Sequence, residues 1–199
     1  MEIINSKQLE ELIESKDFFS KVMSLNEVLS LSNTAISRAF ELLQEADSDN
    51  RMVVSEIIFN VISNARKLED DLICLYNETN DEDLRFDIAI ILMETGNLSV
   101  KNDLINFIRE GEIDKAIEAA IRLSKFKIKE AIEPIQNRLL SCTNDQLEQI
   151  SHLIDALDGL GGKVPKELNT RLSELELPWH LKIRFENPGL FKSSKGGLK

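Results

Sequence analysis

A chain of 199 residues can form one buried core or a stack of short repeats. Hydrophobic residues make up 42% and charged residues 30%, which excludes a disordered chain, and the scarcity of glycine and proline favours helix over sheet. A net charge of −11 disfavours nucleic acid as a partner, because phosphate binding depends on Lys and Arg. We therefore expect an all-α protein that does not bind nucleic acid.

The N-terminal segment, residues 1–47, has helical patterns that do not match the rest of the chain. One apolar stripe includes Leu9, and a second includes Ala39 and Leu43. A stack of repeats needs a terminal element with a polar outer face. We therefore expect an irregular helical cap here, followed by a polar loop at residues 46–50.

Residues 48–177 contain apolar positions that recur at intervals of 31 to 34 residues. Two series run in parallel, and a third follows the second by four residues, on the same helical face. The series are Val61, Leu92, Leu123 and Leu157; Leu72, Leu104, Ile135 and Leu168; and Tyr76, Ile108, Leu139 and Leu172. This period predicts about four helical hairpins, each with an outer and an inner helix.

Turn residues predict where these helices begin and end. Gly96-Asn97 is typical of a helix that ends in a left-handed conformation. Pro134 fits the first turn of an inner helix, where its missing N–H does no harm. The fourth hairpin is predicted to start with Asn144 as its N-cap, to turn at residues 159–162 and to resume after Pro165.

Several stretches resemble HEAT repeats of the short, phycobilisome-lyase-like class. They are Asp83-Leu84-Arg85 with Ala89 and Leu92, residues 130–135 with Leu139, and residues 153–161. The resemblance extends over about residues 50–175. It implies an α-α superhelix, a HEAT- or armadillo-like solenoid whose inner helices line a concave side. This architecture is reused for many purposes, so it does not indicate one function.

The C-terminal segment, residues 178–199, is expected to be a basic and loosely ordered tail. Between Leu181 and Lys199 five basic residues face one acid, a charge of +4, which leaves −15 for the other residues. Trp179 has two interpretations: it anchors a partner, or it plugs the apolar end of the last repeat. Such an acidic body would attract a basic protein surface.

Residues whose side chains can take part in catalysis or bind a metal ion do not occur in the patterns that these functions need. His152 stands alone on a helix, and Asp81-Glu82-Asp83 lacks the spacing of a calcium loop and fits a helix N-terminus instead. Cys74 and Cys142 are too far apart in a solenoid for a disulfide, which suits a reduced cytoplasmic setting. The sequence predicts no enzymatic activity, cofactor, metal site, signal peptide or membrane span.

The leading hypothesis is a non-enzymatic inhibitor or immunity-type protein that masks a basic partner, such as a toxin nuclease. Its candidate binding residues lie outside the apolar series on the inner helices, with Trp179 added: Asp70, Asp71, Asn102, Asp103, Glu130, Glu133, Gln136, Asn137 and Trp179. One alternative is a scaffolding or regulatory subunit that docks through the basic tail. A lyase-like or DNA-lesion-binding repeat protein is a third hypothesis, which the acidity disfavours.

Overall fold

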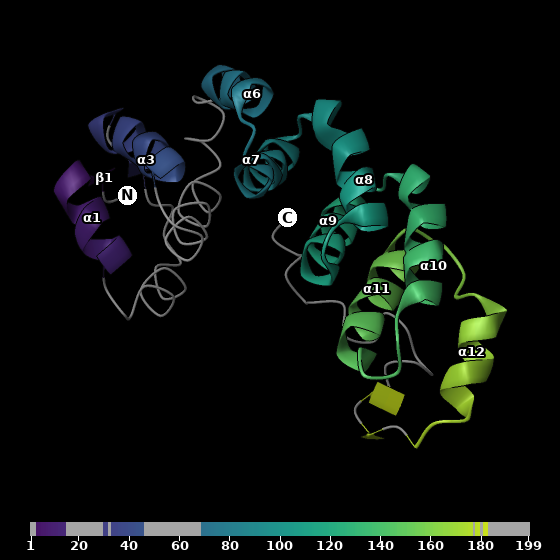
Figure 1. Cartoon of the computed structure of the whole chain (residues 1–199). Helices are drawn as coiled ribbons and strands as arrows, with labels where there is room; N and C mark the ends of the chain where they lie inside the picture. The colour runs from purple at the N-terminus through teal and green to yellow at the C-terminus, as the bar shows by residue number, and fades with distance from the viewer. Residues whose placement is uncertain are drawn as a thin grey trace, which may run out of the picture. The chain divides into compact units, whose positions relative to one another are not determined.

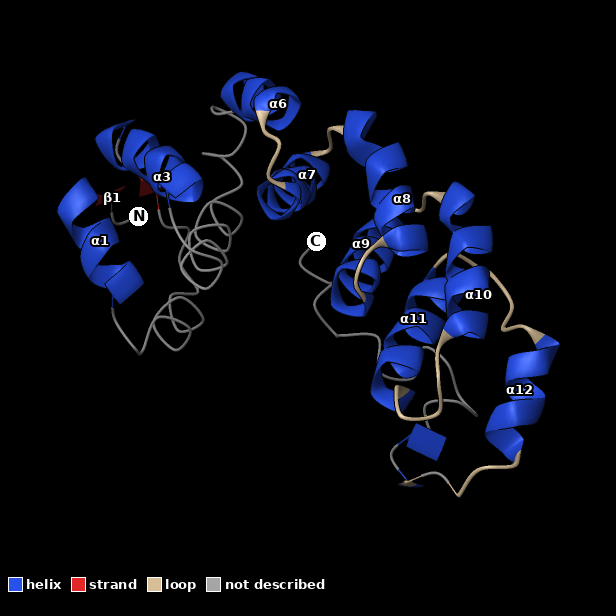
Figure 2. Cartoon of the chain, viewed as in Figure 1, coloured by secondary structure: helices blue, strands red, loops and turns tan. Residues whose placement is uncertain are grey.

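The computed structural model describes residues 3–14, 30–31, 33–45, 69–176, 178–179 and 181–182. These residues form nine α-helices, two short 3-10 helices and one pair of two-residue strands (Figure 2). The chain divides into two compact units, Met1–Val100 and Lys101–Lys199. The prediction of a helical fold is confirmed for the described residues, apart from the strand pair.

The N-terminal part of the first unit pairs two helices, α1 (Ser6–Glu14) and α3 (Asn33–Glu45). Leu9 from α1 and Ala39 and Leu43 from α3 are fully buried, as the apolar stripes predict. Two strands, β1 (Ile3–Ile4) and β2 (Ser30–Leu31), run parallel beside them. A pair of two-residue strands has no alternation long enough to be visible in the sequence.

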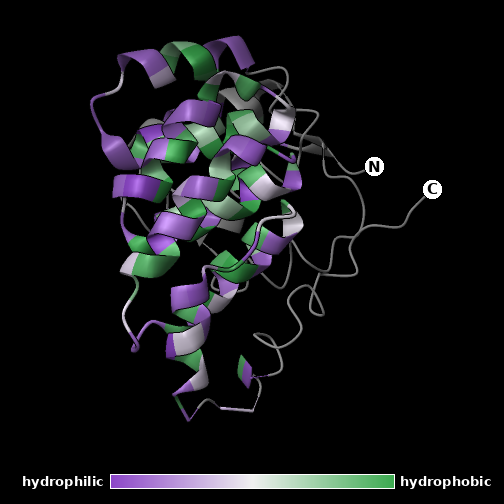
Figure 3. Ribbon diagram, turned by 90° about the vertical axis from the view of Figure 1, so that its right-hand side faces the viewer, coloured by the Kyte–Doolittle hydropathy of each residue, from purple (hydrophilic) through white to green (hydrophobic). Residues whose placement is uncertain are grey.

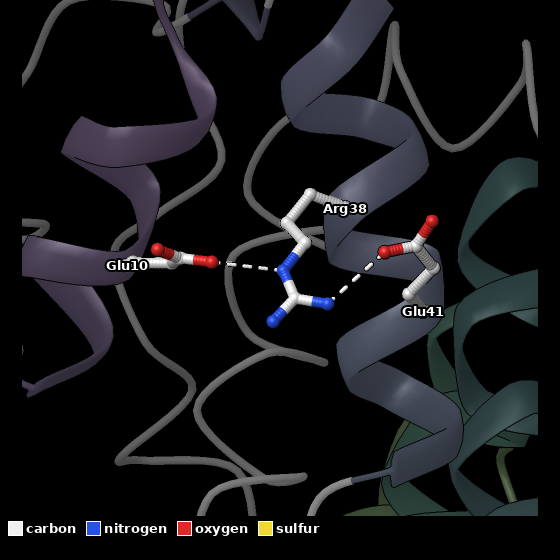
Figure 4. Close-up of polar contacts among 3 residues, drawn as sticks. All are labelled: Glu10, Arg38 and Glu41. Carbon is white, nitrogen blue, oxygen red and sulfur yellow. Dashed lines mark hydrogen bonds and ion pairs between the residues drawn. The ribbon is translucent and has the colours of Figure 1, made fainter.

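An ionic contact also joins α1 to α3. The guanidinium of Arg38 on α3 lies between two carboxylates, at 2.8 Å from Glu10 on α1 and 3.0 Å from Glu41 on α3 (Figure 4). All three side chains retain solvent exposure, so the contact orients the helices and contributes at most about 1 kcal/mol.

The remainder of the first unit consists of α6 (Glu69–Glu78), α7 (Glu82–Thr95) and the 3-10 helix η2 (Leu98–Val100). Helix α7 packs against both α6 and η2. Its residues from Ile88 to Glu94 are all buried, in addition to Leu84 and Phe86. A helix on the outside of a solenoid buries only one face. Helix α7 departs from this along its C-terminal half, whereas Glu82, Asp83 and Arg85 near its start are exposed.

The second unit contains α8 (Lys101–Glu110), α9 (Ile113–Lys125), η3 (Lys129–Ala131), α10 (Ile132–Ser141), α11 (Leu147–Gly159) and α12 (Lys166–Ser173). Helix α9 packs against α8 and α11, and α10 packs against α8, α11 and α12 (Figure 1). Consecutive helices thus alternate between two layers, one with α9 and α11 and one with α8, α10 and α12.

The three apolar series coincide with the core. Val61 lies outside the described residues, and the other eleven members are all buried, with Tyr76 the most accessible at 8%. Apolar residues alternate with polar ones along the helices, as Figure 3 shows. The predicted repeat period is therefore the period at which side chains enter the core.

The backbone repeats at the same period. Three described residues have positive φ, namely Gly96 (92°), Lys127 (59°) and Gly161 (79°), and each follows the leucine of the first series by four positions. In each case the next residue donates its N–H to the carbonyl of that leucine, at 2.9 to 3.0 Å. These are Schellman caps, which end α7, α9 and α11 in the same way.

Several predicted boundaries are confirmed, and one is wrong. Pro134 is the third residue of α10, and α12 begins directly after Pro165. Asn144, predicted as the N-cap of α11, lies in a turn instead, and Gln146 is the N-cap. The reason is local: the side chain of Gln146 accepts a hydrogen bond from the backbone N–H of Thr143 at 3.0 Å, which places the turn before the helix.

Polar side chains link successive hairpins of the second unit in addition to apolar packing. Lys127 Nζ donates to the Gly159 carbonyl at 2.7 Å, joining the end of α9 to the end of α11. Arg138 Nη2 on α10 donates to the Gly111 carbonyl after α8 at 2.8 Å. In both contacts a cation meets the carbonyl-rich C-terminus of a helix, where the helix dipole favours positive charge.

Candidate partner-binding surface

Helices α8 and α10 and the 3-10 helix η3 place the candidate residues of the second unit mainly at exposed positions. Asn102 and Asp103 lie on α8, Glu130 on η3, and Glu133, Gln136 and Asn137 on α10. Asp103 and Gln136 are half-buried, and the other four are exposed. Asn102, Glu130, Glu133 and Asn137 are therefore accessible to solvent.

Two of these candidates already have roles within the fold. Glu130 Oε1 lies 3.0 Å from Lys101 Nζ at the start of α8. A hydrogen bond from its own backbone, and then the Lys101 ammonium, lower the pKa of the Glu130 carboxyl. Gln136 Nε2 donates to the Lys163 carbonyl at 2.7 Å, which ties α10 to the loop before α12. These groups therefore stabilise the stack.

Charge on the inner helices of the second unit is balanced rather than acidic. Helix α8 carries two acids and two bases, η3 with α10 carries two of each, and α12 carries one acid and two bases. The candidate set contains acids and amides from these helices but none of the basic residues between them. Helices α8, α10 and α12 therefore do not present a continuous acidic face.

Acidic residues are concentrated instead in the first unit, on α6, the connection that follows it and the start of α7. We call residues Glu69–Asp87 the acidic hairpin. It contains eight carboxylates and a single base, Arg85. Two of the candidate residues, Asp70 and Asp71, belong to it and are exposed. This segment holds the densest negative charge among the described residues.

Six of the eight carboxylates of the acidic hairpin lie at the N-termini of α6 and α7, where helices favour negative charge. Glu69, Asp70 and Asp71 form the first turn of α6, where the positive end of the helix dipole stabilises anions. Asp81 caps α7 by accepting hydrogen bonds from the N–H groups of Asp83 at 2.9 Å and Leu84 at 3.0 Å. The role predicted for Asp81 and its neighbours at a helix N-terminus is confirmed.

Arg85, the single base of the acidic hairpin, lies over an aromatic ring. Its guanidinium carbon lies 4.8 Å from the centre of the Tyr76 ring, a cation–π contact between α7 and α6. This contact holds the two helices of the hairpin together. The hairpin as a whole sets eight carboxylates against this one base, a net charge of −7.

Trp179 is the most exposed large apolar side chain of the described residues, at 74%. The interpretation that it plugs the end of the last repeat is wrong, because most of its side chain is exposed, whereas Leu181, two residues further on, is buried at 3%. The sequence could not separate the two, since both are large apolar residues in one short segment. Trp179 remains a candidate anchor, and His180 and Phe185 lie outside the described residues.

The two cysteines differ in environment, and neither forms a disulfide. Cys74 on α6 is exposed to solvent, and its thiol donates a hydrogen bond to Glu78 Oε1 at 3.4 Å. That hydrogen bond, and then the negative charge of Glu78, raise the pKa of the Cys74 thiol. Cys142 is buried, and desolvation raises the pKa of its thiol.

His152 lies exposed on α11, as expected for a surface histidine. Within the described ranges, no three His, Cys, Asp or Glu side chains are arranged to hold a metal ion. None of the helices described is both long and apolar enough to cross a membrane. In comparisons with family models, curated proteins and solved structures, nothing matches this chain.

Proposed function

We propose that this chain is a non-enzymatic protein-binding module of the HEAT-like type, which recognises a basic protein surface through its acidic hairpin. The observation that carries the proposal is the density of charge on this segment, with eight carboxylates and one base over Glu69–Asp87. Six of the eight carboxylate side chains are exposed. A field of one sign accelerates encounter with a surface of the opposite sign.

The location of the proposed surface differs from the inner-helix surface that the sequence indicated. Asp70 and Asp71 are retained from the candidate set, because they belong to the acidic hairpin. Glu130 and Gln136 are left out, because their side chains contact Lys101 and the Lys163 carbonyl. An inhibitor or immunity-type role, in which the acidic hairpin masks a cationic toxin or nuclease, is the specific form of this proposal.

Charge reversal with a matched control tests the proposal. One variant carries Asp70→Lys, Asp71→Lys and Glu82→Lys, all exposed in the acidic hairpin. The control carries Glu110→Lys, Glu133→Lys and Glu174→Lys, which are exposed in the second unit and change the net charge equally. Partners are captured from lysate at low salt, identified, purified and measured by surface plasmon resonance, with circular dichroism confirming that both variants fold.

The hairpin variant should slow association at least about tenfold, while the control should slow it far less, and about 0.5 M salt should weaken binding by the wild-type chain. Equal effects of the two variants would mean that total charge matters and the hairpin does not. A larger effect of the control would return the binding surface to the inner helices.

The exposure of Trp179 favours a second candidate function, that of a scaffolding subunit that docks through the C-terminal segment. Removing residues 183–199 and replacing Trp179 by Ala distinguishes the two functions. Binding through the acidic hairpin should survive both changes. Loss of binding after either change would favour the scaffolding role.

A further inference from the structure

We draw no further inference here: the strongest candidate, the guanidinium of Arg171 on α12, whose Nε and Nη2 have no hydrogen-bond partner among the described residues, carries nothing because both nitrogen atoms are closed to solvent and nothing in the structure shows which group would reach them.

Discussion

Lys127 occupies a backbone conformation that glycine adopts more easily, and replacing it separates two opposing contributions to stability. Its φ of 59° lies in the left-handed region, which costs a residue with a Cβ roughly 1–2 kcal/mol. Its ammonium offsets part of this cost through the 2.7 Å hydrogen bond to the Gly159 carbonyl. That contact is exposed, so its net contribution is about 0.5–1 kcal/mol.

Two variants at this position should therefore behave differently. Lys127→Ala retains the unfavourable φ and loses the hydrogen bond, so it should destabilise the protein by about 0.5–1 kcal/mol. Lys127→Gly loses the same bond but relieves the backbone, so its stability should lie within about 0.5 kcal/mol of wild type. The alanine variant should thus be the less stable of the two by about 1 kcal/mol.

Urea unfolding followed by circular dichroism at 222 nm measures this difference, provided that the slope with denaturant is unchanged. Gly96→Ala is a control for the backbone contribution alone. A Cβ at Gly96 would meet nothing within 4 Å, so any loss of stability must come from its φ of 92°. An alanine variant at 127 that is as stable as the glycine variant would refute the argument that the left-handed conformation is costly there.

Three further outcomes are expected. A Cβ on Gly159 would lie 2.2 Å from Ser124 Oγ, so Gly159→Ala should lower the free energy of unfolding by about 1–3 kcal/mol in urea. Adding Ser124→Ala should restore most of this loss, and losses that simply add would contradict the close approach. Ile135→Ala, at a fully buried position, should cost about 2–5 kcal/mol in the same assay, and a loss below 1 kcal/mol would show that the position is not part of a tight core. Glu78→Gln should lower the pKa of the Cys74 thiol, because the substitution removes the carboxylate that raises this pKa. Iodoacetamide should then alkylate Cys74 faster at pH 8, and an unchanged rate would contradict this explanation.

The repeat could be predicted from the sequence because packing imposes a strict period. Leu123 and Leu157 occupy the same place in successive hairpins, and both are fully buried. The Schellman caps follow the same period, but only the two glycines were visible as turn residues. Lys127 was not visible as a turn residue, because lysine has no preference for a left-handed backbone. Its stabilising contact with the Gly159 carbonyl forms only when α9 and α11 have packed together.

Boundaries and environments that depend on side-chain partners could not be read in this way. Asn144 is a good N-cap by type, yet Gln146 takes that position because its side chain contacts the Thr143 backbone. The burial of α7 on all faces from Ile88 to Glu94 was not predicted, since an outer helix was expected to bury one face. Its continuous apolar stretch from Ile88 to Met93 was the available signal.

The distribution of charge follows from the same packing. In the second unit, where α8 and α10 pack together, acids and bases are interspersed, and Lys101 on α8 pairs with Glu130 on η3. In the acidic hairpin, repulsion between carboxylates is offset in another way: Asp70 and Asp71 lie in the first turn of α6, and Asp81 caps α7. Helix dipoles and backbone N–H groups stabilise these anions locally without adding any compensating charge. Local stabilisation of this kind offsets part of the repulsion within a segment whose net charge is −7.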